Sequence, residues 1–208
     1  CIPEEYFDLI VNVKKKLKKY RNIIVSAHCH NDLGLAGANT IAAIRAGAEQ
    51  IECTINGLGE RAGNCPLEEV IAILDLKFKN QIKFNLKLKE IANTCKVVSK
   101  YSSIPIHYNK PILGKNVFSH ASGMHQKAVL KKRNSFEILK AEKFGLMGGN
   151  IIIGKLSGKA AIKNYIKKNN LFIKDGKVNE LLKFIKKDSI KKKELSLKDI
   201  KIIINNLG

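Results

Sequence analysis

The stretch Ile23-Ile24-Val25-Ser26-Ala27-His28, followed at once by Cys29-His30-Asn31-Asp32, decides the fold that this sequence predicts. Its first part is a short β-rich run, and polar residues take over where the run ends. A second run, Gln50-Ile51-Glu52-Cys53-Thr54-Ile55, leads into a polar, glycine-bearing loop of residues 57–64. An Ala-rich helix over residues 35–46 separates the two runs. Two strands joined through a helix predict an α/β fold with a parallel sheet and helices packed outside it.

Further helices are predicted on both sides of this strand pair. Residues 4–20 have apolar side chains at helical spacing, and Pro66 lies at or next to the first turn of another helix. After about residue 80 the pattern changes, and residues 111–160 are irregular and rich in glycine, which is typical of a small accessory lobe. Later helices are expected over residues 87–101, 177–187 and 196–206.

The composition excludes some classes of protein. A net charge of +20 suggests nucleic-acid binding, but the basic residues are 34 Lys and only 4 Arg, spread over predicted helix faces without interleaved aromatic residues. No apolar run approaches the roughly 18–20 residues that span a membrane, and no signal peptide is visible. Five cysteines without a CxxC pair argue against a disulfide framework. We therefore expect a cytoplasmic protein that binds neither nucleic acid nor membrane.

Two polar clusters follow the two predicted strands. His28 and His30 are two residues apart, so both imidazoles are expected on one side of the first strand, where they can hold a divalent metal. In the second cluster, Asn64 offers an amide oxygen to the same metal, and Glu60 can act as an acid/base or anchor Arg61. By spacing alone, one histidine can equally be a hydrogen-bonded core residue and the loop charges can simply pair.

Considered together, these stretches resemble the signature of the 2-isopropylmalate synthase family, and the resemblance runs in order from about residue 3 to residue 200. It rests on residues 28–36 (His-Cys-His-Asn-Asp-Leu-Gly-Leu-Ala), 54–64 (Thr-Ile-Asn-Gly-Leu-Gly-Glu-Arg-Ala-Gly-Asn), 66–69, 109–114 (Asn-Lys-Pro-Ile-Leu-Gly), 118–126 (Phe-Ser-His-Ala-Ser-Gly-Met-His-Gln), 135–139 and 154–159.

The resemblance implies a partial (β/α)8 TIM barrel, consisting of its last two βα units, followed by a small mostly helical accessory subdomain. Residues 1–84 would belong to the barrel, and residues 85–208 would form linker and accessory subdomains without a leucine-binding regulatory domain. The implied reaction condenses acetyl-CoA with 2-oxoisovalerate in leucine biosynthesis, and this makes the protein an acyltransferase. A divalent cation (Mn²⁺, Mg²⁺ or Zn²⁺) would polarise the keto group of the 2-oxo acid.

The family also implies a role for individual residues. His28, His30 and Asn64 match metal ligands. His125 and Glu60 are expected to be catalytic, and Asn31, Asp32 and Gly63 to bind substrate. His125 would come from the accessory subdomain of the second subunit of a homodimer.

Several features depart from the family pattern. The Arg-Asp pair of barrel strand 1 has no counterpart here, so a segment supplying strands 1–6 is an expected partner and the chain alone is expected to be inactive. Phe136 stands where the family usually has Tyr, and Lys127 and Leu156 replace a usual Asp and His. Homocitrate synthase, citramalate synthase and a non-catalytic remnant or complementing subunit stay open as alternatives.

Overall fold

The computed structural model describes residues 1–120, 138–148, 150–174, 176–190 and 195–207. The chain divides into two compact units, Cys1–Gly114 and Lys115–Gly208. Within the described ranges, none of the helices has the length and apolar character needed to cross a membrane. The predicted division into residues 1–84 and 85–208 stays a prediction.

The first unit contains the predicted pair of strands. Its elements are α1 (Pro3–Leu17), β1 (Ser26–His28), α2 (Ala36–Arg45), β2 (Gln50–Glu52), the 3-10 helix η1 (Ile55–Gly57), α3 (Leu67–Lys77), the 3-10 helix η2 (Leu88–Glu90) and α4 (Ile91–Ser102). β1 pairs with β2 in parallel, with Ser26 opposite Gln50 and His28 opposite Glu52. The predicted parallel α/β arrangement is confirmed, but both strands are shorter than the apolar runs suggested.

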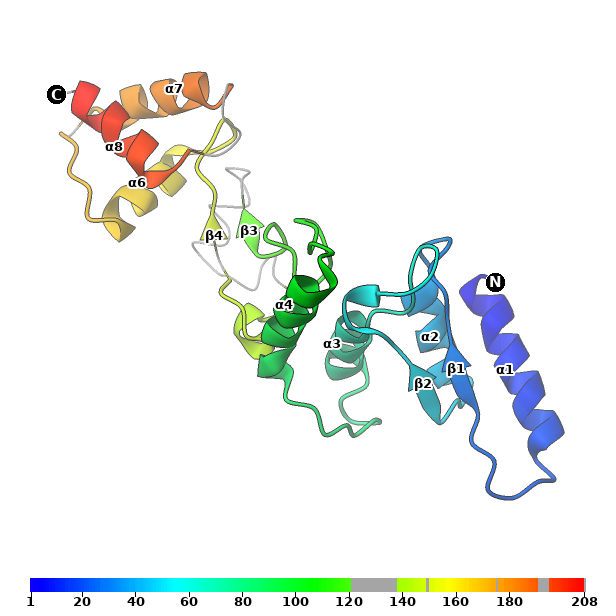
Figure 1. Ribbon diagram of the computed structural model, residues 1–208. Helices are drawn as coiled ribbons and strands as arrows, with labels where there is room; N and C mark the ends of the chain where they lie inside the picture. Colours follow the sequence, from blue (N-terminus) through cyan, green and yellow to red (C-terminus); the bar gives the residue numbers. More distant parts are fainter. Residues whose placement is uncertain (121–137, 149, 175, 191–194, 208) are drawn as a thin grey trace. The chain divides into compact units, whose positions relative to one another are not determined.

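The two faces of β1 differ in burial. Val25, Ala27 and Cys29 are buried, whereas the alternating residues Ser26, His28 and His30 are exposed. Val25 and Ala27 pack with side chains of α1 and α2, and Cys29 packs with side chains of α2 and α3. The helices therefore cover one face of the strand pair (Figure 1), and the histidines lie on the other face.

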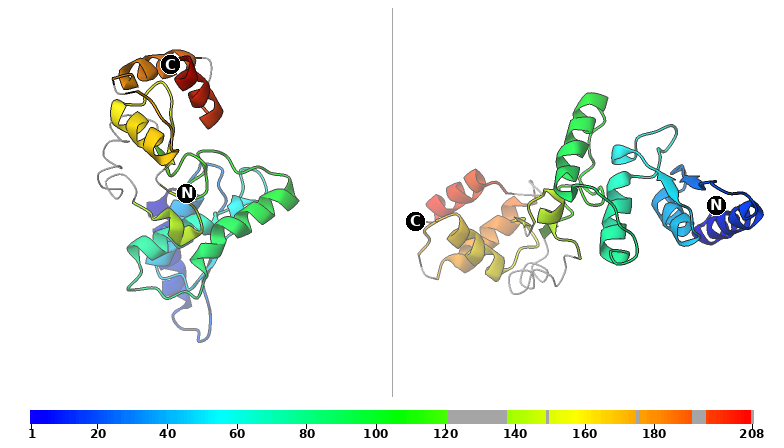
Figure 2. Two further views of the ribbon diagram at one scale, coloured as in Figure 1. Left: turned by 90° about the vertical axis from the view of Figure 1, so that its left-hand side faces the viewer. Right: turned by 90° about the horizontal axis from the view of Figure 1, so that it is seen from below.

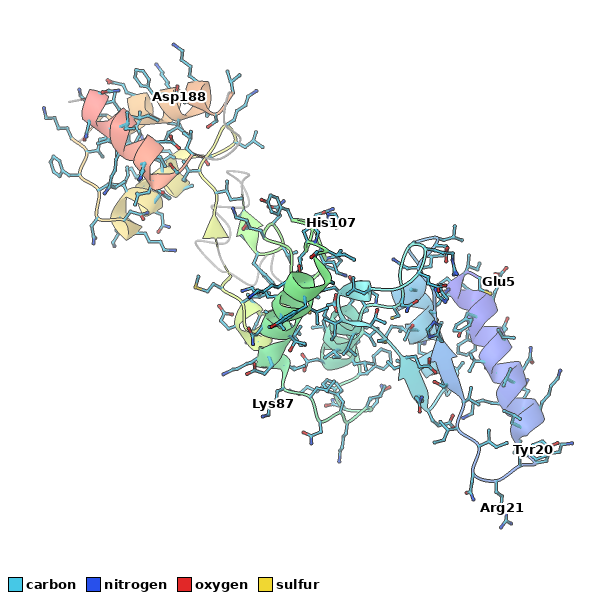
Figure 3. The ribbon with its side chains drawn as sticks, viewed as in Figure 1. Glu5, Tyr20, Arg21, Lys87, His107 and Asp188 are labelled. Carbon is cyan, nitrogen blue, oxygen red and sulfur yellow. The ribbon has the colours of Figure 1, made fainter. Side chains whose placement is uncertain are left out.

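Some connecting segments of the first unit lie away from the strand pair and the helices that cover it. The link between α1 and β1 carries Tyr20 and Arg21, which lie at its outer end (Figure 3). Lys87 precedes α4, and His107 follows it in another loop (Figure 3). The end of β1, where the candidate site begins, is held instead by hydrogen bonds to the loop after β2.

The described part of the second unit contains the helices α6 (Lys159–Lys168), α7 (Val178–Asp188) and α8 (Leu197–Asn206). The three helices lie close together (Figure 2), and Ile162, Leu181 and Ile200 belong to one buried core. β3 (Ser119–His120) and β4 (Asn150–Ile151) form a short parallel pair, and the 3-10 helix η4 spans Ala141–Phe144. The two terminal helices are confirmed. α6 was not predicted, although Ala161, Ile162 and Tyr165 recur at helical spacing.

Candidate metal centre

The two predicted metal-binding histidines lie together at the end of β1. The Nε2 atoms of His28 and His30 are 3.3 Å apart, and the ring centroids are 4.9 Å apart in an edge-to-face arrangement. His28 ends the strand, and His30 forms an antiparallel bridge with Asn64 of the glycine-bearing loop. A hollow of about 270 Å³ adjoins both imidazoles and is also lined by Tyr6, Asp32 and Leu35. The structure therefore brings the imidazoles of His28 and His30 together and places Asn64 opposite His30.

The donor atoms at this place suit a divalent cation. The side-chain oxygen of Asn64 is buried and has no hydrogen-bond partner among the described residues. Two facing imidazole nitrogens need either a shared proton or a cation near both of them. Imidazole nitrogens with an amide oxygen fit Mn²⁺ or Zn²⁺. Within the described ranges there is no group of three or more His, Cys, Asp or Glu side chains placed to hold a metal, so the predicted set depends on Asn64 for a third ligand.

Backbone hydrogen bonds hold Asn64 in position. The N–H of Asn64 donates to the carbonyl of Gly57 over 3.0 Å, and the N–H of Asn31 donates to the carbonyl of Gly63 over 2.8 Å. Gly59 faces the Asn64 side chain so closely that a Cβ atom there would lie 2.6 Å from the amide nitrogen. The glycines therefore allow the loop backbone to pack directly against the Asn64 side chain.

Asp32 and Arg61 join the two polar clusters. Arg61 Nε donates to Asp32 Oδ1 over 2.8 Å, and Nη2 donates to Oδ2 over 3.0 Å. The hydrogen bond from Arg61 lowers the pKa of the Asp32 carboxyl, and the same bond raises the pKa of Arg61. Glu60, predicted as a possible anchor for Arg61, is exposed, and Asp32 forms the two-bond contact with Arg61 instead. The sequence analysis did not predict this ion pair. The presence of two opposite charges in neighbouring βα loops could have indicated it.

The remaining predicted site residues have mixed outcomes. The side-chain oxygen of Asn31 accepts a hydrogen bond from the Ala36 N–H at the start of α2 over 3.1 Å, so it also supports that helix. His125, Lys127 and Phe136 lie outside the described residues. Leu156 is exposed. The substrate-binding and acid/base roles stay predictions.

A buried ion pair behind the loop was also missed. Glu68 is 1% exposed, and its Oε2 accepts a hydrogen bond from the backbone N–H of Asn56 over 3.1 Å. Lys110 Nζ lies 3.1 Å from Glu68 Oε1 and 2.6 Å from Glu69 Oε1. Asn56 has a left-handed φ of 60°, and its side-chain amide donates to the carbonyl of Cys95 in α4. This network fixes the first turn of the loop that ends at Asn64.

Comparison with known proteins supports the family resemblance that the sequence motifs indicate. Residues 1–98 match the HMGL-like family, and residues 112–193 match the homocitrate synthase post-HMGL domain-like family. A 2-isopropylmalate synthase of Pyrococcus furiosus is 41% identical over 204 residues, which are 97% of this chain and 41% of that protein. A 2-isopropylmalate synthase of Acetivibrio thermocellus is 42% identical over 97% of this chain and 40% of that protein.

The chain thus spans about two-fifths of the length of these relatives. The two regions matched by family models lie one after the other and leave only short stretches unmatched. The HMGL-like region contains His28, His30 and Asn64, and it belongs to a family of TIM-barrel enzymes. The region of residues 1–98 therefore matches the HMGL-like family, and the chain shares both matched regions with relatives named 2-isopropylmalate synthase.

Proposed function

We propose that this chain supplies the metal-binding part of a 2-isopropylmalate synthase, the acyltransferase that condenses acetyl-CoA with 2-oxoisovalerate in leucine biosynthesis. The observation that carries the proposal is that the His28 and His30 imidazoles lie together at the end of β1, with Asn64 bridged to His30 and its buried side-chain oxygen lacking a hydrogen-bond partner among the described residues. The names of the relatives favour this reaction over those of homocitrate and citramalate synthases. In this proposal, residues 1–84 are the last two βα units of a barrel, and residues 85–208 are linker and accessory subdomains.

In the proposed site, different residues bind the metal, bind the substrate and transfer protons. A bound divalent cation would polarise the keto carbonyl of the 2-oxo acid. His28, His30 and Asn64 hold the metal, while Asn31, Asp32 and Gly63 contact the substrate. A base removes a methyl proton from acetyl-CoA, the carbanion equivalent attacks the keto carbon, and water hydrolyses the thioester to release CoA. Glu60 and His125 take part in these proton transfers.

The proposed active protein is a cytoplasmic homodimer whose barrel also includes strands 1–6. Cys1, Cys29, Cys53, Cys65 and Cys95 are all free thiols, as a reducing compartment requires. In such a dimer, the second copy contributes His125 to the site. The test is to combine this chain with a segment matching the first part of the Pyrococcus furiosus relative and to measure CoA release. Turnover is expected with 2-oxoisovalerate. A preference for 2-oxoglutarate or pyruvate would assign the chain to a sister enzyme instead.

The metal assignment makes a prediction for this chain by itself. His28→Ala is expected to weaken Mn²⁺ binding about tenfold or more, because one of three ligands is removed. Calorimetric titration measures the affinity. His107→Ala is the matched control, since His107 is an exposed histidine of the same unit, in the loop after α4 (Figure 3). Equal Mn²⁺ affinity of the two variants would show that His28 is not a ligand.

A further inference from the structure

Glu52, a residue that the sequence did not single out, makes a close contact with His28. It ends β2 and lies directly opposite His28 in the parallel register. Its Oε2 is 3.1 Å from His28 Nδ1, and its Oε1 accepts a hydrogen bond from the Ser26 hydroxyl over 3.0 Å. One carboxylate oxygen is therefore anchored to β1, and the other faces the imidazole.

This contact determines which imidazole nitrogen carries the proton. A carboxylate accepts hydrogen bonds and donates none, so the neutral His28 ring beside it keeps its proton on Nδ1. The lone pair is then on Nε2, the atom that lies 3.3 Å from His30 Nε2. We propose that Glu52 is a positioning residue, which holds His28 in the orientation and tautomer that present Nε2 to the divalent metal. This inference rests on the metal site of the proposed function.

The alternative is an ordinary ion pair on an open strand surface, which would contribute little to any property of the site. The placement of Ser26 argues against this alternative. The Ser26 hydroxyl and the His28 imidazole project from the same face of β1, and each contacts one oxygen of the Glu52 carboxylate. Carboxylates or carbonyls that accept a hydrogen bond from a metal-binding imidazole commonly set its tautomer, and their loss weakens metal binding about 10–100-fold.

Glu49 provides a matched control beside the same strand. Its carboxylate contacts Lys14 Nζ and the backbone N–H of Val25. Glu49→Ala therefore removes a carboxylate from the same region without changing the surroundings of His28. Glu52→Gln is a conservative variant, since its amide oxygen can still accept the proton of Nδ1.

The experiment uses the full chain at about pH 8, where unperturbed imidazoles are neutral. Long-range ¹H–¹⁵N NMR of the metal-free protein is expected to show the Nδ1–H tautomer of His28 in the wild type and in Glu49→Ala. In Glu52→Ala this preference is lost. Titration with Co²⁺, followed by its visible absorption, is expected to show about tenfold or weaker binding for Glu52→Ala and an intermediate affinity for Glu52→Gln.

The two readouts separate this inference from the proposed function. An unchanged His28 tautomer in Glu52→Ala overturns the positioning role, whatever the metal affinity. Co²⁺ binding that is as tight in Glu52→Ala as in Glu49→Ala overturns it as well. If the wild type binds no Co²⁺, the proposed metal site fails, while the tautomer measurement in the metal-free protein still decides whether Glu52 orients His28.

Discussion

Replacing Lys110 by Met is expected to lower the free energy of unfolding of the Cys1–Gly114 unit by about 3–5 kcal/mol, the usual loss when one partner of a buried ion pair is removed. Glu68 is 1% exposed, and Lys110 Nζ lies 3.1 Å from its Oε1. Met fills a similar volume but leaves the Glu68 carboxylate buried without its cation. Denaturant unfolding followed by circular dichroism measures the loss.

Two further variants test the reason for this loss. Lys14→Met removes a lysine that pairs with Glu49 at the surface, so a much smaller loss is expected. Adding Glu68→Gln to Lys110→Met removes the uncompensated charge, and the double variant is expected to be more stable than Lys110→Met alone. A loss for Lys110→Met no greater than for Lys14→Met would show that the pair does not stabilise the unit.

The same ion pair has a signature in the pH dependence of stability. Burial alone would lower the pKa of Lys110, but the hydrogen bond to Glu69 and the charge of Glu68 outweigh burial and raise it. A pKa raised on folding stabilises the protein fully below the unfolded value, ordinarily 10.5, and this stabilisation is lost as the pH rises through the folded value. The stability difference between wild type and Lys110→Met is therefore expected to be constant near neutral pH and to shrink in strongly alkaline solution.

The sequence predicted the strand pair and the shared side of His28 and His30 because both depend on local periodicity. Alternation along residues 25–30 is enough to place His28 and His30 on one side, and the exposure of the alternating residues confirms this placement. The parallel pairing follows from the helix that joins the two strands. Asn64 was assigned through the family resemblance, and the structure brings it opposite His30.

The interactions that the sequence did not reveal all join residues distant along the chain. The contact between Glu52 and His28 depends on which residue of β2 lies opposite His28, and the alternation within β1 does not specify that residue. Lys110 reaches Glu68 from more than forty residues downstream, so no local pattern indicates the pair. In each case the polar groups could have been recognised, but their partners could be found only in three dimensions.

Gly63→Ala is expected to destabilise the Cys1–Gly114 unit by about 3 kcal/mol or more, since a strained φ and a steric clash each cost about 1–3 kcal/mol. Gly63 has a φ of +91°, and a Cβ atom there would lie 2.1 Å from the carbonyl oxygen of Gly57. That oxygen belongs to the backbone and cannot rotate away as a flexible side chain would. The added methyl group must therefore displace the loop itself.

Displacement of the loop is expected to reach the proposed metal centre. The carbonyl of Gly57 accepts the hydrogen bond of the Asn64 N–H, and the carbonyl of Gly63 accepts that of Asn31. Moving either glycine breaks a bond that holds Asn64 opposite His30. Weakened binding of Co²⁺ is therefore expected together with the loss of stability, about tenfold or more, as when other supports of a metal ligand are removed.

Gly37→Ala is the matched control for this prediction. Gly37 lies in the first turn of α2, and a Cβ atom there would have no heavy atom within 4 Å. The same methyl group is expected to stabilise the unit there by about 0.5 kcal/mol, because alanine restricts the unfolded chain more than glycine does. Denaturant unfolding and Co²⁺ titration of the two variants give the comparison. If Gly63→Ala matched Gly37→Ala in both measurements, the tight packing of the loop against Gly57 would not be what holds Asn64 at the metal centre.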